Sequence, residues 1–203
     1  MSAADEIARR AVHVGGAAFP LAYLADIHLL AGDVVTWPRL RLVYLLAAAV
    51  AVGLEFVRLA VGLEWAVFRR LTREYEQDNP AGYALYAVGS AIAALVFDPI
   101  VAVPALLALA IVDPLSGLLS RREHRRVKRP SVLGVTFALS VIIAAAFVPL
   151  PAAILGGAAV TVADGVKPAI EGVVLDDNFT IPVGASVAMW VGVAYLPATP
   201  TLA

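Results

Sequence analysis

The sequence contains no cysteine, and only 15% of its 203 residues are Asp, Glu, Lys or Arg. The absence of cysteine excludes a disulfide framework, a thiolate metal site and a cysteine nucleophile. The scarcity of charge accompanies a mean hydropathy of +0.86, which is untypical of a soluble fold. The apolar runs approach the ~20 residues that a helix needs to cross a lipid bilayer. The composition therefore predicts a polytopic membrane protein.

Several nucleotide and metal motifs are also missing. The chain has no GxxxxGK[ST] loop, no GxGxxG segment after a strand and no HExxH pair, so a P-loop enzyme, a dinucleotide-binding oxidoreductase and a zincin are unsupported. The apolar runs are rich in Ala, Leu and Val and do not alternate with polar residues, which favours helices over a membrane barrel. We therefore expect an all-α bundle in which any nucleotide chemistry uses a membrane-specific site.

The apolar runs predict seven transmembrane helices. Their approximate bounds are residues 11–30, 42–67, 83–97, 100–119, 132–150, 152–163 and 181–196. Pro99 and the pair Pro149 and Pro151 fall where tight turns would join the third helix to the fourth and the fifth to the sixth. No repeat of fixed period is visible. Residues 1–203 are therefore expected to form a single integral-membrane domain.

The basic residues are distributed unevenly between the two sides of the predicted bundle. With a cytoplasmic N-terminus, only Arg39 and Arg41 lie outside, and Arg58 lies within a span. The basic residues on the cytoplasmic side are Arg9, Arg10, Arg69, Arg70, Arg73, Arg121, Arg122, Arg125, Arg126, Lys128, Arg129 and Lys167. This bias follows the positive-inside rule and predicts a cytoplasmic N-terminus in a multi-pass protein of the cell membrane.

An acid-rich stretch separates the last two predicted helices and faces the cytoplasm in this topology. Its ionisable and amide side chains are Asp164, Lys167, Glu171, Asp176, Asp177 and Asn178. Magnesium binds proteins through one or two carboxylates together with substrate phosphates, so the stretch is a candidate metal site. The alternative is a solvated loop, because Gly165, Pro168 and the Asp-Asn pair also favour turns.

A second polar group follows the fourth predicted helix, which we expect to end at Asp113 and Pro114. Residues 121–129 then contain six Arg and Lys residues and lead to Ser131 and Gly134. A polyphosphate needs cations for its oxygens and a carboxylate for the accompanying magnesium, and both are present in this stretch. Alternatively, the basic run could bind anionic lipid headgroups.

Two further charged groups have helical spacing. Arg10 and His13 share a helix face and could hold a phosphate or accept a proton from a hydroxyl, although Arg10 also fits the positive-inside rule. Glu55 and Arg58 lie inside the second predicted helix, where each charge costs ~2.5 to 3.5 kcal/mol. Their spacing allows them to pair, so their face should point into the bundle. The alternative role for this pair is structural.

These residues resemble the conserved blocks of the dolichol kinase and phytol kinase family, membrane enzymes distantly related to the phosphatidate cytidylyltransferases. The matching blocks are ExxxRxxH at residues 6–13, ExxR at 55–58, Asp-Pro at 113–114, SxxG at 131–134 and DDNFTIP at 176–182. The chain departs from the family pattern in one region. The segment after Pro114 is Arg-rich rather than Gly-rich, and Pro130 rather than Lys precedes Ser131, which suggests that Arg side chains replace some backbone amides on the phosphates.

The resemblance implies CTP-dependent phosphorylation of a long-chain polyisoprenoid alcohol, of the dolichol or polyprenol type, to its monophosphate at the cytoplasmic face. Magnesium would be the cofactor, with ATP as the alternative donor. The candidate catalytic residues are His13, Glu55, Arg58, Asp113 and Asp177. The candidate phosphate-binding residues are Arg10, Arg125, Lys128, Ser131, Lys167 and Asn178. The candidate metal ligands are Asp113, Asp164 and Asp177.

Two other functions remain open at the level of the sequence. One is a cytidylyltransferase that makes a CDP-lipid, and the other is a membrane transporter or flippase that uses Glu55 and Arg58 along its path. The expected partners are the alcohol, the nucleotide and the lipid bilayer, with no nucleic acid. Gly156 and Gly157 offer a small-residue face through which a homodimer could form.

Overall fold

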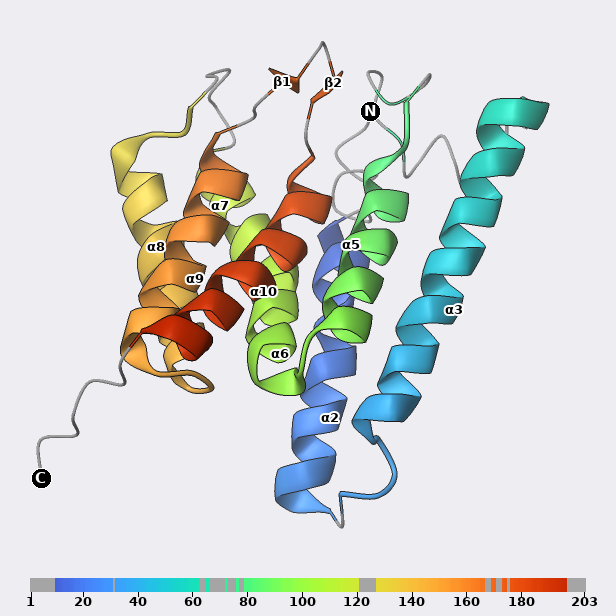
Figure 1. Cartoon of the computed structure of the whole chain (residues 1–203). Coiled ribbons are helices and arrows are strands. Elements are labelled where there is room, and N and C mark those ends of the chain that lie inside the picture. Colours follow the sequence, from blue (N-terminus) through green and yellow to red (C-terminus); the bar gives the residue numbers. More distant parts are fainter. Residues whose placement is uncertain are drawn as a thin grey trace, which may run out of the picture.

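The computed structural model describes residues 10–30, 32–62, 79–120, 127–166, 169–170, 173–174 and 176–196, together with Trp65, Thr72 and Glu76. This part of the chain is helical throughout, apart from its turns, an isolated bridge between Val127 and Val166, and a short antiparallel pair of strands. The strands are β1 (Ala169–Ile170) and β2 (Val173–Val174) (Figure 1). The all-α prediction is therefore confirmed for the described residues.

Each predicted apolar run is largely helical within the described residues, although a turn at residues 16 and 17 divides the first run. Residues 10–15 are helical, and α2 (Ala18–Leu29), α3 (Trp37–Phe56) and the π-helix η1 (Val57–Val61) follow. The next elements are α5 (Gly82–Val96), α6 (Pro99–Leu107), the π-helix η3 (Ala108–Val112) and α7 (Asp113–Leu119). The last are α8 (Pro130–Ala145), α9 (Leu150–Gly165) and α10 (Asp177–Tyr195).

The ends of the second helix differ from the prediction for local reasons. The helix begins at Trp37 rather than residue 42, with Thr36 in an extended conformation before it and a proline in its first turn. It ends at Val61 rather than residue 67, because Gly62 adopts a left-handed conformation with φ of 69°. Glycine accepts this conformation without steric cost and commonly terminates helices.

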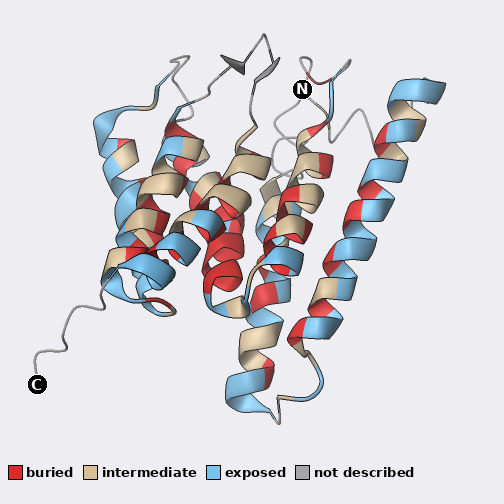
Figure 2. Ribbon diagram, viewed as in Figure 1, coloured by how far each residue is buried: buried red, intermediate tan, exposed pale blue. Residues whose placement is uncertain are grey.

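Within the described residues, three helical segments are long and apolar enough to cross a membrane: Trp37–Val61, Pro99–Leu119 and Asp177–Tyr195. The shorter helices α5, α8 and α9 are also apolar. Figure 2 shows exposed residues along the outer faces of α3 and α8, and large exposed side chains such as Val50, Val52 and Ile142 are hydrophobic. Apolar residues on the outside of a helical bundle are typical of a membrane protein.

The segment from α6 through η3 to α7 is the centre of the fold. In its most apolar stretch 72% of the residues are buried, whereas in that of the α3–η1 segment only 28% are buried. Helix α10 packs against α9, α5 and α6, while α8 packs against α9 and α3 packs against α5 (Figure 1). The central position of this segment places Asp113, the first residue of α7, among several neighbouring helices.

Gly156 and Gly157 in α9 allow close packing against neighbouring helices of the same chain. A Cβ atom on Gly156 would lie 2.5 Å from Cγ of Met189 in α10, and one on Gly157 would lie 2.5 Å from Cγ2 of Val141 in α8. These close approaches explain why glycine is needed at both positions. The pair is therefore buried between helices of one chain and is not a free face for a homodimer.

The polar ends of several helices gather at one end of the bundle. In Figure 1 the ends of α7 and α9 and the starts of α5, α8 and α10 lie together at the top. Arg39 and Arg41, at the start of α3, lie at the opposite end. There Arg41 Nε donates to the carbonyl of Ala94 at 2.9 Å, near the last turn of α5. The chain thus separates these two arginines from the residues that the sequence singled out for chemistry.

Candidate functional site

Three carboxylates converge at the polar end of the bundle. Asp113 opens α7, Asp164 lies in the last turn of α9 and Asp177 opens α10, and one oxygen from each lies within 4.8 Å of the others. Asp164 is fully buried, and the other two are partly buried. The structure therefore brings together the three residues that the sequence predicts as metal ligands. Converging carboxylate oxygens fit a hard divalent cation such as Mg²⁺.

The π-helix before Asp113 changes the expected position of this residue. The backbone N–H of Asp113 donates to the carbonyl of Ala108, five residues earlier, in the π-helical pattern. The helix then continues to Leu119, as the apolar run 100–119 predicts, so Asp113 and Pro114 lie within the helix and do not mark its end. Asp113 instead lies within a continuous, mostly buried helical segment. Single-turn π-helices are frequent at functional sites.

Pro114 explains how the π-helix creates a binding position for His13. Because Pro114 has no N–H and the N–H of Asp113 bonds to Ala108, neither residue supplies the expected backbone partner for the carbonyl of Leu109. His13 Nε2 lies 2.8 Å from that carbonyl oxygen. The same nitrogen lies 3.3 Å from Oδ2 of Asp113.

The N-terminal segment reaches this position by packing closely on α5. The rings of His13 and Tyr86 meet edge to face with centroids 4.7 Å apart, and the Tyr86 hydroxyl donates to the carbonyl of His13 at 3.3 Å. A Cβ on Gly16 would lie 1.8 Å from the Tyr86 hydroxyl oxygen, so no other residue fits there without movement. Tyr86 was not predicted from the sequence.

Helix capping places Asp177. Oδ1 of Asp176 accepts from the backbone N–H of Asn178 at 2.9 Å and from its side-chain Nδ2 at 2.6 Å. This N-cap starts α10 at Asp177, rather than at residue 181 as the apolar run alone predicts. Aspartate is among the best N-cap residues. The second Asp of the pair is consequently held in the first turn, beside the other two carboxylates.

Asp164 is surrounded by donors. Ser116 Oγ donates to its Oδ2 at 2.5 Å, and Thr136 Oγ1 donates to the same oxygen at 3.4 Å. Lys128 Nζ forms an ion pair with Oδ1 and also donates to Ser116 Oγ at 2.7 Å. The backbone holds Lys128 in place through a bond from its N–H to the carbonyl of Gly165 at 3.2 Å.

The environment of Asp164 was only partly predictable. Lys128 was predicted to bind phosphate, whereas in the structure its ammonium group pairs with a predicted metal ligand. Ser116 and Thr136 were missed. Ser116 had a usable signal, since it follows Asp113 by three residues and so shares its helix face. Thr136 had none, because its contact depends on how α8 packs on α9.

A cavity of about 90 Å³ lies beside His13, the residue that contacts Asp113. Its lining residues are Val12, His13, Glu76, Gly82, Tyr83, Tyr86 and Asn178. His13 connects the cavity to Asp113, and Asn178 connects it to the neighbouring Asp177. Among the residues that the structure describes, no Lys or Arg lines this cavity.

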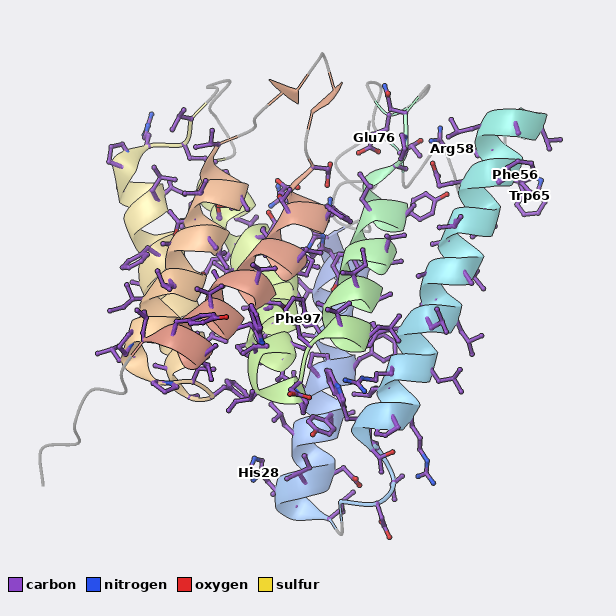
Figure 3. The ribbon with its side chains drawn as sticks, viewed as in Figure 1. His28, Phe56, Arg58, Trp65, Glu76 and Phe97 are labelled. Atoms are coloured by element: carbon purple, nitrogen blue, oxygen red, sulfur yellow. The ribbon has the colours of Figure 1, made fainter. Side chains whose placement is uncertain are left out.

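Glu55 and Arg58 form an ion pair that binds the segment before α5. Arg58 donates from Nε and Nη2 to the two oxygens of Glu55 at 3.0 and 2.7 Å. Glu55 also accepts from the N–H of Ala81 at 3.1 Å, while Arg58 donates to the carbonyl of Asn79 at 2.7 Å. Figure 3 shows Arg58 near the end of α3, on the side of α5. Neither residue lines the cavity, so their catalytic role stays a prediction.

The remaining predicted residues differ in position. Arg10 lies close to α7, because a Cβ on Gly117 would be 3.9 Å from its Nη2. Ser131 is exposed in the first turn of α8 and has no contact here with the three carboxylates. Arg125 and Lys167 lie outside the described residues.

No protein-family model matches the chain, and no significant match was found among curated proteins or solved structures. The function therefore has to be inferred from the residues and their geometry.

Proposed function

We propose that the chain is a single-domain integral-membrane kinase that transfers the γ-phosphoryl group of CTP, or alternatively ATP, to a long-chain polyisoprenoid alcohol. The observation that carries the proposal is the convergence of Asp113, Asp164 and Asp177 beside His13, at one end of an apolar helical bundle. Phosphoryl transfer requires little covalent chemistry from a protein and depends on positioning and charge neutralisation. The resemblance of the sequence blocks to dolichol and phytol kinases supports the same reaction.

The three aspartates would hold magnesium, which when bound neutralises negative charge on the triphosphate. Lys128 would lie on the donor side of the site, since it is already adjacent to Asp164. The other predicted phosphate-binding residues are Arg10, Arg125, Ser131, Lys167 and Asn178. Of these, Arg10 lies near α7 and Asn178 follows a carboxylate of the site, which fits their proposed role.

His13 would accept the proton of the alcohol. The carbonyl of Leu109 can only accept a hydrogen bond, so Nε2 carries the hydrogen and Nδ1 is the basic nitrogen of the neutral ring. As the alcohol oxygen bonds to the γ-phosphorus, the bond from that phosphorus to the β,γ-bridging oxygen breaks. The nucleoside diphosphate leaves, and the alcohol proton passes to Nδ1.

The membrane orientation follows from the charge distribution. Arg39 and Arg41 lie at the end of the bundle opposite the three carboxylates, and Lys128, from the basic stretch that the sequence places between α7 and α8, pairs with one of these carboxylates. By the positive-inside rule, we propose a multi-pass protein with its site on the cytoplasmic side.

Because the chain has no cysteine, single cysteines can report its orientation without background mutations. In intact cells, an impermeant maleimide should label Asp33→Cys, between α2 and α3. Arg129→Cys, just before α8, should be labelled only after permeabilisation. The reverse pattern would refute the proposed orientation.

The reaction itself can be tested with purified protein in lipid nanodiscs. CTP and ATP, labelled in either the α- or the γ-phosphate, are offered with dolichol, polyprenol, geranylgeraniol and diacylglycerol. The proposal requires γ-label on an isoprenoid alcohol. Transfer of α-label to a lipid would instead identify a cytidylyltransferase, and no transfer from either nucleotide would refute both enzymes.

A further inference from the structure

The start of α5 is held by two charged residues from the end of the α3–η1 segment. Oε2 of Glu55 accepts from the N–H of Ala81 at 3.1 Å, and Nη2 of Arg58 donates to the carbonyl of Asn79 at 2.7 Å. Ala81 is the N-cap residue of α5 and is fully buried. Its N–H has no partner within the helix, and a buried N–H without a partner is costly. Glu55 thus satisfies the backbone group at which α5 begins.

The same helix carries the contacts that place His13. Tyr86 lies about one turn into α5, and its ring meets the ring of His13 edge to face. The Tyr86 hydroxyl also donates to the carbonyl of His13. A Cβ on Gly16 would lie only 1.8 Å from that hydroxyl oxygen, so the N-terminal segment fits closely around Tyr86. A shift at the start of α5 would therefore displace His13 as well.

The charges of Glu55 and Arg58 are poorly explained by stability alone. Charged side chains within a membrane segment are costly, and apolar residues often replace a buried ion pair without loss of stability. An apolar pair, however, could not make directed hydrogen bonds to Asn79 and Ala81. Neither Glu55 nor Arg58 is among the described residues that line the cavity, so their contacts point to the backbone before α5 rather than to a ligand there.

We propose that Glu55 and Arg58 are positioning residues for the proton acceptor. They fix the start of α5, and Tyr86 transmits that position to His13. The effect on catalysis rests on the proposed kinase function, in which His13 takes the proton of the alcohol. A misplacement of about 1 Å near a reacting group can cost about a hundredfold in rate. The pair would thus influence the reaction without contacting the reacting atoms.

The variant Ala81→Pro tests this path while leaving both charged residues in place. It removes the N–H that Glu55 accepts, and the φ of −77° at this position suits proline. With polyprenol and CTP, we expect kcat to fall about tenfold or more, with little change in the KM of the nucleotide. In a His13→Gln background the same change should have almost no further effect, because the misplaced group is already absent. A merely structural role would lower kcat equally in both backgrounds.

Arg41→Met is the matched control, because Arg41 joins the same two helices at their opposite ends. Its Nε and Nη2 donate to the carbonyls of Ala94 and Phe97 at 2.9 and 3.3 Å, and α3 lies beside α5 (Figure 1). The loss of these bonds should lower thermal stability. The kcat should stay unchanged, since the start of α5 is still held.

A double variant covers the case in which Ala81→Pro fails to fold. Glu55→Leu combined with Arg58→Met removes the bonds to Asn79 and Ala81 without leaving an unpaired charge. It should show the same loss of kcat, and the same lack of effect in the His13→Gln background. Thermal unfolding establishes which variants are folded.

The position of the N-terminal segment can be measured without turnover. The chain has no cysteine, so nitroxide labels can be attached to Val12→Cys and Val162→Cys, two positions that are 63% and 62% exposed. Double electron–electron resonance then gives the distance distribution between the N-terminal segment and α9. It should broaden or shift in Ala81→Pro and in the double variant, and stay as in the wild type in Arg41→Met.

The two measurements separate this inference from the kinase proposal. Unchanged label distances in the folded variants, or an equal fall of kcat with and without His13, would overturn the positioning role. If the distances change as expected but the wild-type protein transfers no phosphoryl group, the kinase proposal fails, while Glu55 and Arg58 still position the N-terminal segment.

Discussion

Nε2 of His13 lies 3.3 Å from Oδ2 of Asp113, although the two residues come from the N-terminal segment and from the central helix of the bundle. The contact joins a residue suited to proton transfer with a residue suited to metal binding. The ring is oriented by a second contact to the Leu109 carbonyl at 2.8 Å. His13 therefore both contacts one of the three carboxylates and forms part of the wall of the cavity.

Replacing His13 by glutamine should remove the proton acceptor while keeping a donor for Leu109. We expect kcat to fall by roughly 10² to 10⁴, the usual contribution of a general base, with little change in the KM of the nucleotide. Steady-state kinetics with polyprenol and CTP measure both values. His28→Gln is the control, because His28 is exposed near the opposite end of the bundle (Figure 3). An unchanged kcat in His13→Gln would contradict this role.

Introducing an N–H group at position 114 should disturb the contact between His13 Nε2 and the Leu109 carbonyl. In Pro114→Ala the new N–H competes with His13 for the Leu109 carbonyl. The loss of a hydrogen bond worth about 1 kcal/mol predicts a roughly fivefold fall in kcat. Pro104→Ala also gains an N–H in the same buried segment but lies away from Leu109. Thermal stability should therefore shift in the same direction in both variants, and kcat should fall only in Pro114→Ala.

The adjacent residues Asp176 and Asp177 should separate helix capping from metal binding. Asp177→Asn removes one carboxylate of the three, and the loss of several kcal/mol of charge stabilisation predicts a fall in kcat of about a hundredfold or more. The helix should survive, because its N-cap is Asp176. Asp176→Asn should retain activity, since Asn caps helices as well as Asp does. Manganese binding, followed by electron paramagnetic resonance, should weaken only in Asp177→Asn. Equal manganese binding in the two variants would contradict the metal site.

The sequence predicted the helices well because apolar runs and helix length are linked by simple geometry. Errors occurred where a single residue controls a helix end. Gly62 stops the α3–η1 segment earlier than the apolar run suggests, and Asp176 starts α10 earlier. Such ends depend on backbone conformation and side-chain capping, which hydropathy does not report.

The three aspartates were predictable because carboxylates at the ends of neighbouring apolar helices have few other places to lie. The surroundings of the site were not. Thr136 and Tyr86 reach it only through the packing of α8 on α9 and of the N-terminal segment on α5. Ser131 was chosen by motif and proved exposed, which shows that position in a sequence block does not fix the direction of a side chain.

The ion pair between Lys128 and Asp164 gives a direct test of whether a cation belongs at this site. Asp164 is fully buried and the Lys128 side chain is 15% exposed, so removing one partner leaves an uncompensated charge at a cost of about 3 to 5 kcal/mol. We expect thermal stability to fall in both Lys128→Met and Asp164→Asn. The double variant should recover part of the loss, because no unpaired charge remains.

Magnesium should distinguish the two single variants. In Lys128→Met the three carboxylates remain without their ammonium group, and a divalent cation can replace its charge, so added magnesium should restore thermal stability. In Asp164→Asn one ligand is lost and an unpaired ammonium group remains, so magnesium should restore little. Arg39→Met, at the opposite end of the bundle, controls for the loss of a basic residue. If magnesium fails to stabilise Lys128→Met, the three carboxylates serve only to hold Lys128 and its neighbours, and the metal site must be abandoned.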